Sequence, residues 1–345
     1  MADAVETADV LIRDAVGAQA AAWGTIDPAT MLSTSCVLCG ELDHGLGALP
    51  PHVIERERRL FELEWADDEP NTFWQLVRTG RTAAALRLDV GDPTRLARYR
   101  ELLMPLAIND ELRLLLDIDG RSWGTAIFYR SVPEPFNGAD VERARECGPV
   151  VAAALRRAML RAVCDSPQLP SPPGALVVDQ HDVAVVSSTA AEGLLDSLDD
   201  AQAATTLTSL AASTRARGAS SITVTGPGGV VTLHGSPAKG IDGGVAVVVE
   251  RPRSIELAPL IMHAVGFTPR ERAAAELLLA GRSRTQIARL LDVSTHTVGD
   301  HLRQVYRKAG VASRGELAAF LYGRYYEQPR AEQVPPSPYG YFVGR

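Results

Sequence analysis

The sequence predicts a multidomain α+β protein in which two strand-containing units precede an all-α unit of four short helices. Four helix-start signals follow one another within residues 267–321. Strand-like runs and turn dipeptides recur within residues 1–165 and 175–252. A proline-rich segment, residues 166–174, separates these two regions as a linker. At 345 residues and 46% hydrophobic composition, the chain is long enough for two or three cores.

The first unit, residues 1–165, shows strands framed by helices. Its strongest local signal is Asp119-Gly120 between two apolar, β-rich runs, the pattern of a tight hairpin. A strand-rich centre with helices at both ends predicts an α+β sandwich. The elements expected are helix Val5–Ala22, strands Trp23–Ile26 and Met31–Leu38, helices Pro50–Trp65, Thr72–Thr79 and Thr94–Leu103, strands Leu112–Ile118 and Ser122–Tyr129, and helix Val141–Val163.

All four tryptophans lie in this first unit. Aromatic side chains commonly line ligand cavities, but they also dominate ordinary cores. An ordinary core is the simpler interpretation, and a ligand pocket is the alternative. The residues expected to line such a pocket are Phe61, Trp65, Trp74 and Trp123.

The second unit, residues 175–252, alternates short strands with two helices. Pro227-Gly228-Gly229 marks a turn within a second hairpin. A connecting helix is expected over residues 253–265, and the tail, residues 326–345, is expected to be loosely ordered. The expected elements are strands Ala175–Val178 and Val183–Val186, helices Ala190–Leu198 and Ala201–Arg217, and strands Ser221–Thr225, Val230–Leu233 and Val245–Glu250.

The last unit, residues 266–325, is defined by its helix caps. A serine or threonine followed three residues later by Glu or Gln forms a capping box, which recurs three times. The boxes are Thr268 with Glu271, Ser283 with Gln286, and Ser313 with Glu316; Ser294 caps a further helix, and Gly281 and Gly310 are stops.

The second and third of these helices are joined by the short turn Leu291-Asp292-Val293, which predicts a helix-turn-helix. The third helix has two faces. One is an apolar stripe with helical spacing, and the other is polar and partly basic. Such a helix can enter the major groove of DNA, whereas a plain packing bundle is the alternative. The stripe contains Val298, Leu302, Val305 and Ala309, and the opposite face contains His296, Asp300, Arg303 and Arg307.

The charge distribution supports a polyanion-binding surface at this end of the chain. Residues 263–325 contain ten Lys or Arg and five Asp or Glu, a net charge of +5, whereas the whole chain carries −7. The last twenty residues sum to zero, so residues 1–262 carry −12. A basic unit on an acidic carrier is typical of local nucleic-acid binding.

This segment closely resembles the LuxR-type C-terminal DNA-binding domain, a four-helix module. The matching residues extend over about a sixth of the chain. They are Thr268, Pro269, Arg270, Glu271, Gly281, Ser283, Ile287, Ala288, Val293, Ser294, Thr297, Val298, His301, Leu302, Tyr306, Lys308, Gly310, Val311, Ser313, Arg314, Glu316 and Leu317.

The resemblance implies a surface that binds double-stranded promoter DNA. Thr295, His296, Thr297, Gly299, Asp300 and Arg303 are expected at or beside base edges, and the helix cap Ser294 is also expected in the DNA-binding surface. Arg282, Arg284, Thr285, His301, Arg307 and Lys308 are expected at phosphates.

The chain departs from the family pattern directly after Thr297-Val298, where many members have lysine and this chain has Gly299 followed by Asp300. An aspartate weakens attraction to phosphate but can accept a hydrogen bond from the N4 amino group of cytosine. We therefore expect DNA binding with an altered base preference.

The two preceding units resemble sensory domains. Residues 1–165 resemble a GAF-like domain in element order, in the Trp123-Gly124 strand after a Gly turn, and in Phe136 before a long closing helix. Residues 175–252 have the order of a PAS-like fold. Such domains bind a small molecule over the sheet, or bind nothing and only dimerise.

Other chemistries have weak support. Cys36 and Cys39 form a lone Cys-x-x-Cys near His44, whereas a structural zinc site needs four ligands, so semi-buried thiols are the simpler interpretation. No catalytic constellation or dinucleotide motif is present, so we expect no enzyme and no cofactor. No apolar run reaches the ~18 residues that a membrane span needs, and the acidic start lacks a signal-peptide pattern.

Together these patterns predict a cytoplasmic DNA-binding transcriptional regulator without a membrane segment, acting as a homodimer. A possible small-molecule effector would bind the sensory units and control promoter binding. The alternative is control by a protein partner, with sensory units that dimerise and bind no ligand.

Overall fold

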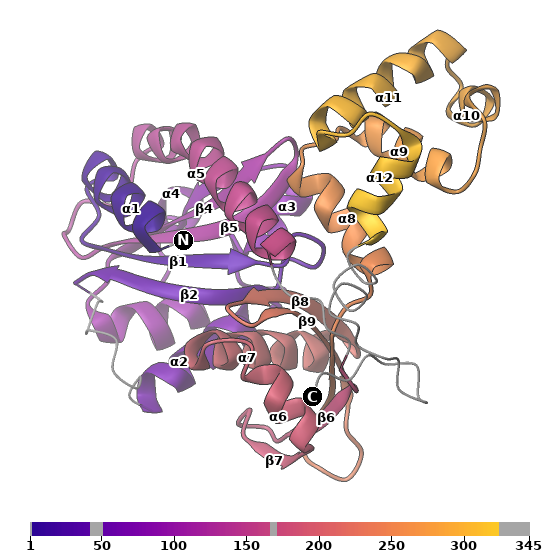
Figure 1. Ribbon diagram of the computed structural model, residues 1–345. Coiled ribbons are helices and arrows are strands. Elements are labelled where there is room, and N and C mark those ends of the chain that lie inside the picture. The colour runs from indigo at the N-terminus through magenta and orange to yellow at the C-terminus, as the bar shows by residue number, and fades with distance from the viewer. Residues whose placement is uncertain (1, 42–50, 166–170, 324–345) are drawn as a thin grey trace.

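The computed structural model describes residues 2–41, 51–165 and 171–323. Two five-stranded antiparallel sheets and a helical C-terminal unit follow one another along the chain (Figure 1). The prediction of a mixed α/β protein with a C-terminal helical unit is confirmed. The tail at 326–345 and residues 166–170 of the predicted linker lie outside the described residues.

The first sheet has the strand order β2-β1-β5-β4-β3. Helices α1 and α5 cover one face, where Trp23, Phe128 and Leu155 are buried in a common core. Shorter helical segments cover the other face. The strands are β1 (Ala20–Ile26), β2 (Ser33–Gly40), β3 (Ala83–Ala85), β4 (Asp110–Ile118) and β5 (Arg121–Arg130). The helical segments are α1 (Ala2–Val16), α2 (Pro51–Leu63), α3 (Phe73–Thr79), α4 (Leu86–Val90), a π-helical turn (Tyr99–Leu103), a 3-10 turn (Met104–Leu106) and α5 (Gly138–Asp165).

The β4–β5 hairpin turns at the dipeptide that the sequence indicates. Asp119 has φ 57° and Gly120 has φ 73°, so both central residues are left-handed, as a two-residue hairpin of the primed type requires. The sequence placed this turn correctly because the constraint is local.

Three expectations for the first unit differ from the structure. The first helix ends at Val16, and Ala20–Ala22 belong to β1, because Gly17 adopts φ 64° and ends the helix. Within the expected helix Thr94–Leu103, helical structure begins at Ala97 and continues as a π-turn over Tyr99–Leu103, with a 3-10 turn directly after it. Strand β3 was not expected, since three alanines carry no strand signal and are defined by pairing with β4.

The second sheet has the order β7-β6-β10-β9-β8. Numbered within its own unit, this is the same 2-1-5-4-3 order as the first sheet. Helices α6 and α7 cover one face, over a core that includes Leu210, Val231 and Val247. The elements are β6 (Gly174–Val178), β7 (Ala184–Ser187), α6 (Thr189–Leu195), α7 (Asp200–Arg217), β8 (Ser220–Gly226), β9 (Gly229–Pro237) and β10 (Val245–Glu250).

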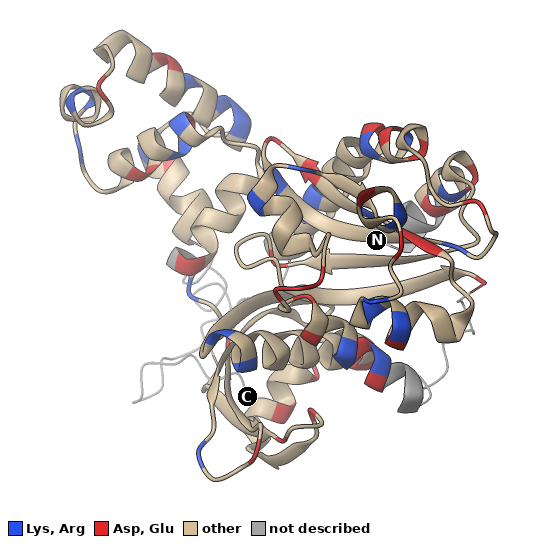
Figure 2. Cartoon of the chain, turned by 180° about the vertical axis from the view of Figure 1, so that it is seen from behind, with Lys and Arg blue, Asp and Glu red and all other residues tan. Residues whose placement is uncertain are grey.

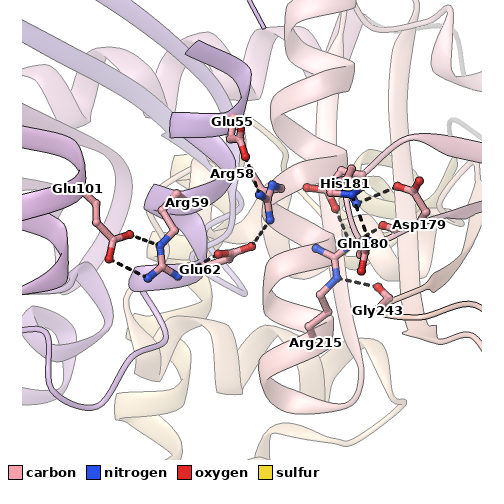
Figure 3. Close-up of polar contacts among 11 residues, drawn as sticks. Glu55, Arg58, Arg59, Glu62, Glu101, Asp179, Gln180, His181, Arg215 and Gly243 are labelled. Atoms are coloured by element: carbon pink, nitrogen blue, oxygen red, sulfur yellow. Dashed lines mark hydrogen bonds and ion pairs between the residues drawn. The ribbon is translucent and has the colours of Figure 1, made fainter. Parts of the chain in front are cut away.

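Helix α7 lies between the second sheet and the first unit (Figure 1). Its buried side chains are mostly small or hydroxylated, which lets both neighbours approach closely. The backbone N–H of Ser33 donates to Ser209 Oγ at 3.0 Å, and Thr205 Oγ1 donates to Glu57 Oε1 at 2.7 Å. Near the end of the helix, Arg215 donates to the carbonyl of Gly243 at 2.8 Å (Figure 3). Hydrogen bonds therefore hold α7 to both sides.

The helical unit projects from the sheets and is joined to them by α8 (Figure 1). Leu257, Ala258 and Ile261 of α8 share one core with Val163 of α5 and with the C-terminal helices. A single apolar core thus continues from the first two units into the last unit. The elements are α8 (Ser254–Ala264), α9 (Pro269–Leu279), α10 (Arg284–Leu291), α11 (Thr295–Ala309), α12 (Arg314–Ala318) and a π-turn (Ala319–Gly323).

No helix within the described residues is both long and apolar enough to cross a lipid bilayer.

Candidate nucleic-acid interface

The predicted caps position the last four helices. Thr268 and Glu271 form a reciprocal capping box at α9, and Ser283 and Gln286 form one at α10. Ser294 Oγ accepts from the Thr297 backbone N–H at 3.0 Å and so starts α11. Each cap satisfies backbone donors that the first helical turn leaves unpaired.

Helix α11 shows the two predicted faces. Val298, Leu302 and Val305 are fully buried against α9 and α10. Asp292, in the left-handed conformation with φ 52°, ends α10 and so creates the turn between the two helices of the motif. The remaining face of α11 is therefore free to contact a ligand.

The exposed face of α11 is polar and self-paired in the absence of DNA. Asp300 forms an ion pair with Arg303, one turn further along the helix, and His296 Nε2 lies 4.0 Å from the Asp300 carboxylate. Arg307 donates to Gln304 Oε1 from two nitrogens, at 3.0 and 2.7 Å. Arg303 is 70% exposed, so its guanidinium can leave Asp300 for a base or phosphate at small cost.

The surface of α11 is open at Gly299, because a side-chain Cβ at this position would have no atom within 4 Å. A glycine inside a helix lowers its stability by roughly 0.5–1 kcal/mol relative to alanine. The glycine therefore lowers helix stability at a position where no neighbouring residue packs against the helix. The backbone at Gly299 is thereby left uncovered beside the exposed Asp300.

The expected phosphate-contacting residues occupy different environments. Arg282, Arg284 and Thr285 are exposed at the start of α10, whose N-terminal N–H groups also favour anions. His301 is half-buried. Lys308 donates to the Gly266 carbonyl at 2.9 Å and to Glu271 Oε2 at 2.6 Å. The ammonium of Lys308 is thus used within the protein, where it ties α11 to the capping box of α9.

A histidine–arginine contact joins α8 to this unit. His263 Nδ1 accepts from Arg272 Nη1 at 2.7 Å. Burial and the nearby Arg121 and Arg272 charges lower the pKa of His263 to about 4. The ring is therefore neutral and accepts the hydrogen bond at neutral pH.

This contact predicts pH-dependent stability. The unfolded histidine has its ordinary pKa near ~6.5, so between pH 6.5 and 4 the unfolded chain binds more protons than the folded one. The contribution of His263 is complete above about pH 6.5 and is lost as pH falls toward 4. Thermal unfolding scans at pH 7.5 and 5.0 should show a smaller decrease in Tm for His263→Asn than for the unchanged protein. An equal decrease would show that His263 does not cause the pH dependence.

Three of the four expected pocket residues meet in one cavity of about 40 Å³. Phe61 and Trp65 from α2 and its C-terminal turn, with Phe73 and Trp74 from α3, form its aromatic walls. Ser209 of α7 contributes a wall from the second unit, so the cavity lies between the first and second units. Since one water needs about 10–15 Å³ on this measure, the cavity has room for only a few small groups as it stands.

Trp123 does not line this cavity. It is buried in the core on the α1/α5 side of the first sheet. The β4–β5 pairing shifts register between Leu116 and Asp117, which places Trp123 at a β-bulge. Strict alternation along β5 would put it on the same face as Thr125, which does line the cavity.

A buried ion cluster, missed from the sequence, lies beside the cavity. Arg113 pairs with Glu64 and with Glu111, and Arg98 Nε lies 2.8 Å from Glu111 Oε1 and Arg98 Nη1 lies 3.9 Å from Glu69 Oε2. Burial lowers the pKa of Arg98. Burial raises the pKa of Glu111, but the charges of Arg113 and Arg98 outweigh it, so the pKa of Glu111 lies below its usual value. Glu64 also lines the cavity. Glu64, Glu69 and Arg98 come from separate segments of the chain, far from Glu111 and Arg113 in sequence, so no sequence pattern indicated the cluster.

The Cys36–Cys39 pair has the geometry expected on a strand. In β2, Cys36 is exposed, whereas Cys39 packs against the first core. Residues three apart on a strand point to opposite faces, which disfavours a shared metal. His44 lies outside the described residues, and the described residues contain no group of three or more metal-ligating side chains.

Comparison with known proteins identifies the class of the last unit. Residues 265–321 match the family described as "Bacterial regulatory proteins, luxR family". This segment is therefore a LuxR-type helix-turn-helix DNA-binding domain, and the resemblance stated from its sequence is confirmed. A comparison with curated proteins gives no match.

Solved structures show only remote likeness. A domain of a two-component sensor histidine kinase protein from Sinorhizobium meliloti 1021 aligns at 15% identity over 48% of this chain and 96% of that one, with a TM-score of 0.33. A Vibrio cholerae VqmA–ligand–DNA complex aligns at 19% identity over 45% and 84%, with a TM-score of 0.22. A phage VqmA–DPO complex aligns at 21% over 52% and 92%, with a TM-score of 0.25. Scores this low do not establish a shared overall fold.

Proposed function

We propose that the protein is a homodimeric transcriptional regulator whose N-terminal units sense a small molecule and control promoter binding. The observation that carries the proposal is the exposed polar face of α11, bracketed by the exposed Arg282 and Arg284 of α10. Its apolar face is fully engaged in the core, so the helix presents Thr295, His296 and Arg303 outward. A helix with exposed polar and basic side chains on one face can enter the major groove of DNA and contact base edges there. Figure 2 displays the basic residues of this unit.

Within this proposal, the residues of α11 at base edges are Thr295, His296, Thr297, Gly299, Asp300 and Arg303. Arg282, Arg284, Thr285, His301 and Arg307 contact phosphates, and Ser294 caps the helix beside the DNA. We assign Lys308 a structural role, because its ammonium already bonds to Gly266 and Glu271. Two copies are needed, since a single short helix reads few base pairs and two half-sites multiply specificity. Binding to promoters places the protein in the cytoplasm.

We assign the first unit as GAF-like and the second as PAS-like. The support is the strand order 2-1-5-4-3, which both sheets share although the sequence shows no repeat. The cavity between α2, α3 and α7 is the place where an effector would contact both units at once.

The test is selection of genomic fragments by the purified full-length protein, followed by titration of one selected fragment at several salt concentrations. Phosphate contacts release counterions, so log affinity should fall linearly with log salt, with a slope of about −0.9 for each phosphate neutralised. The double variant Arg282→Ala/Arg284→Ala should reduce the slope by about two. Failure to enrich any fragment at low salt would refute the proposed function, and a salt-independent affinity would refute the phosphate contacts.

A further inference from the structure

Trp65 and Trp74, at the contact between the first and second units, both contact a cationic side chain of the protein, that of Arg217. The Arg217 guanidinium carbon lies 5.0 Å from the ring centroid of Trp65 and 4.9 Å from that of Trp74. The two rings are 6.1 Å apart and inclined at 51°, so they form a V-shaped cleft. Cations within ~6 Å of an aromatic face are attracted by its electron density, most strongly by tryptophan.

The same two rings are also walls of the cavity described above. Phe61 and Phe73 supply further aromatic faces, and among the described residues Glu64 is the one charged residue that lines the cavity. The described lining contains no cationic side chain, although the Arg113 guanidinium carbon, paired with Glu64, lies 5.0 Å from the Phe73 ring centroid. An aromatic lining with one carboxylate favours a positively charged group over an anion.

The ion cluster behind the cavity has the same preference. Glu64, Glu69 and Glu111 are linked through Arg98 and Arg113, so three carboxylates face two guanidiniums. The cluster carries one uncompensated negative charge within the described residues. A buried negative charge is screened weakly and attracts a cation at the adjacent aromatic surface.

Arg217 is suited to being displaced. It is the last residue of α7 and is exposed, so its guanidinium is hydrated again when it leaves the rings. Arg215, two residues earlier, is bonded to Gly243, Asp179 and Asp182, which keeps the helix end in place. Removal of Arg217 from the cleft therefore changes one contact between the two units without unfolding α7.

From these contacts we infer that the Trp65–Trp74 cleft and its cavity bind a small organic cation, such as a quaternary ammonium compound, whose head group replaces the Arg217 guanidinium. The short chain attached to the head group enters the cavity. Binding removes the contact between Arg217 of α7 and the two tryptophans of the first unit, so it changes how α7 and the second sheet are held against that unit. The inference rests on the sensing part of the proposed function.

The experiment is calorimetric titration of the full-length protein with choline, and with 3,3-dimethylbutan-1-ol, its neutral isostere, in the same buffer. Choline should bind and the neutral isostere should bind at least tenfold more weakly. Arg217→Ala removes the internal competitor and should tighten choline binding by roughly tenfold. Arg78→Ala removes an exposed arginine near the end of α3 and should leave the affinity unchanged. Trp74→Leu should weaken binding at least tenfold.

Trp74→Phe keeps an aromatic wall if the leucine variant is unstable in thermal unfolding, and it should give an intermediate affinity. Equal binding of choline and its isostere, or equal affinity in the protein with and without Arg217, would overturn the inference. So would the absence of choline binding by both the unchanged protein and Arg217→Ala. DNA binding measured on the same preparations separates the two proposals, because intact DNA binding without choline binding leaves the regulator assignment standing.

Discussion

Replacing Arg303 with alanine is expected to weaken binding to a selected promoter fragment by about 10–100-fold, as for loss of one base-contacting arginine. Arg303 lies on the exposed face of α11 and, within the described part of the chain, bonds only to Asp300, so its removal leaves the core of the helix intact. Gel-shift or fluorescence-anisotropy titrations at a fixed salt concentration measure the effect. The far-UV circular dichroism spectrum should remain unchanged.

Two control variants make this result specific. Arg78→Ala removes the same charge from a distant surface and should leave DNA affinity nearly unchanged. Asp300→Asn removes the carboxylate that pairs with Arg303 and should raise affinity for unrelated DNA, because one repulsive charge is lost. If Asp300 reads cytosine, the same variant also loses discrimination at one base pair. An Arg303→Ala protein that binds its fragment with unchanged affinity would refute the placement of α11 in the groove.

Leu302→Ala is expected to destabilise the DNA-binding unit by roughly 2–5 kcal/mol and to abolish promoter binding near its unfolding temperature. Leu302 is 1% exposed and packs in the core shared by the four C-terminal helices. A loss of this size is a large fraction of the total stability of a small unit. Urea unfolding followed by circular dichroism, together with DNA titration, measures both effects.

Leu290→Ala is the matched control. Leu290 lies on α10 and is 60% exposed, so the same truncation should change the free energy of unfolding by less than about 0.5 kcal/mol. Comparable destabilisation by both variants would show that the two faces of the helix-turn-helix are not distinguished by burial as described.

The sequence predicted those features whose causes are local. Capping boxes at Thr268 and Ser283 place helix starts, because a side chain and a backbone N–H three residues away satisfy each other. The Asp119-Gly120 turn was equally predictable, since few dipeptides adopt two successive positive φ angles. The exposed and buried faces of α11 followed from helical spacing alone.

The features that were missed depend on tertiary contacts. Strand β3 consists of three alanines, and only pairing with β4 makes them a strand. The Arg98–Glu111–Arg113 cluster joins residues from separate elements, so spacing gives no warning of it. The ligand pocket kept as an alternative to an ordinary core included Trp123 as a wall, but a β-bulge, invisible in the sequence, places that ring on the other face of the sheet. Arg217 was not selected because its ring contacts come from the other unit.

The continuity of the core through α8 has a practical consequence for protein engineering. Phe267, Leu317 and Leu321 lie in the same apolar core as Leu257 and Ile261 of that helix, so the family match from residue 265 is smaller than the unit that packs as one body. A chimera that joins this helix-turn-helix unit to another protein should therefore have its junction before Ser254, where α8 begins. A junction at residue 265 would expose the apolar residues that share a core with α8, and an exposed apolar patch promotes aggregation.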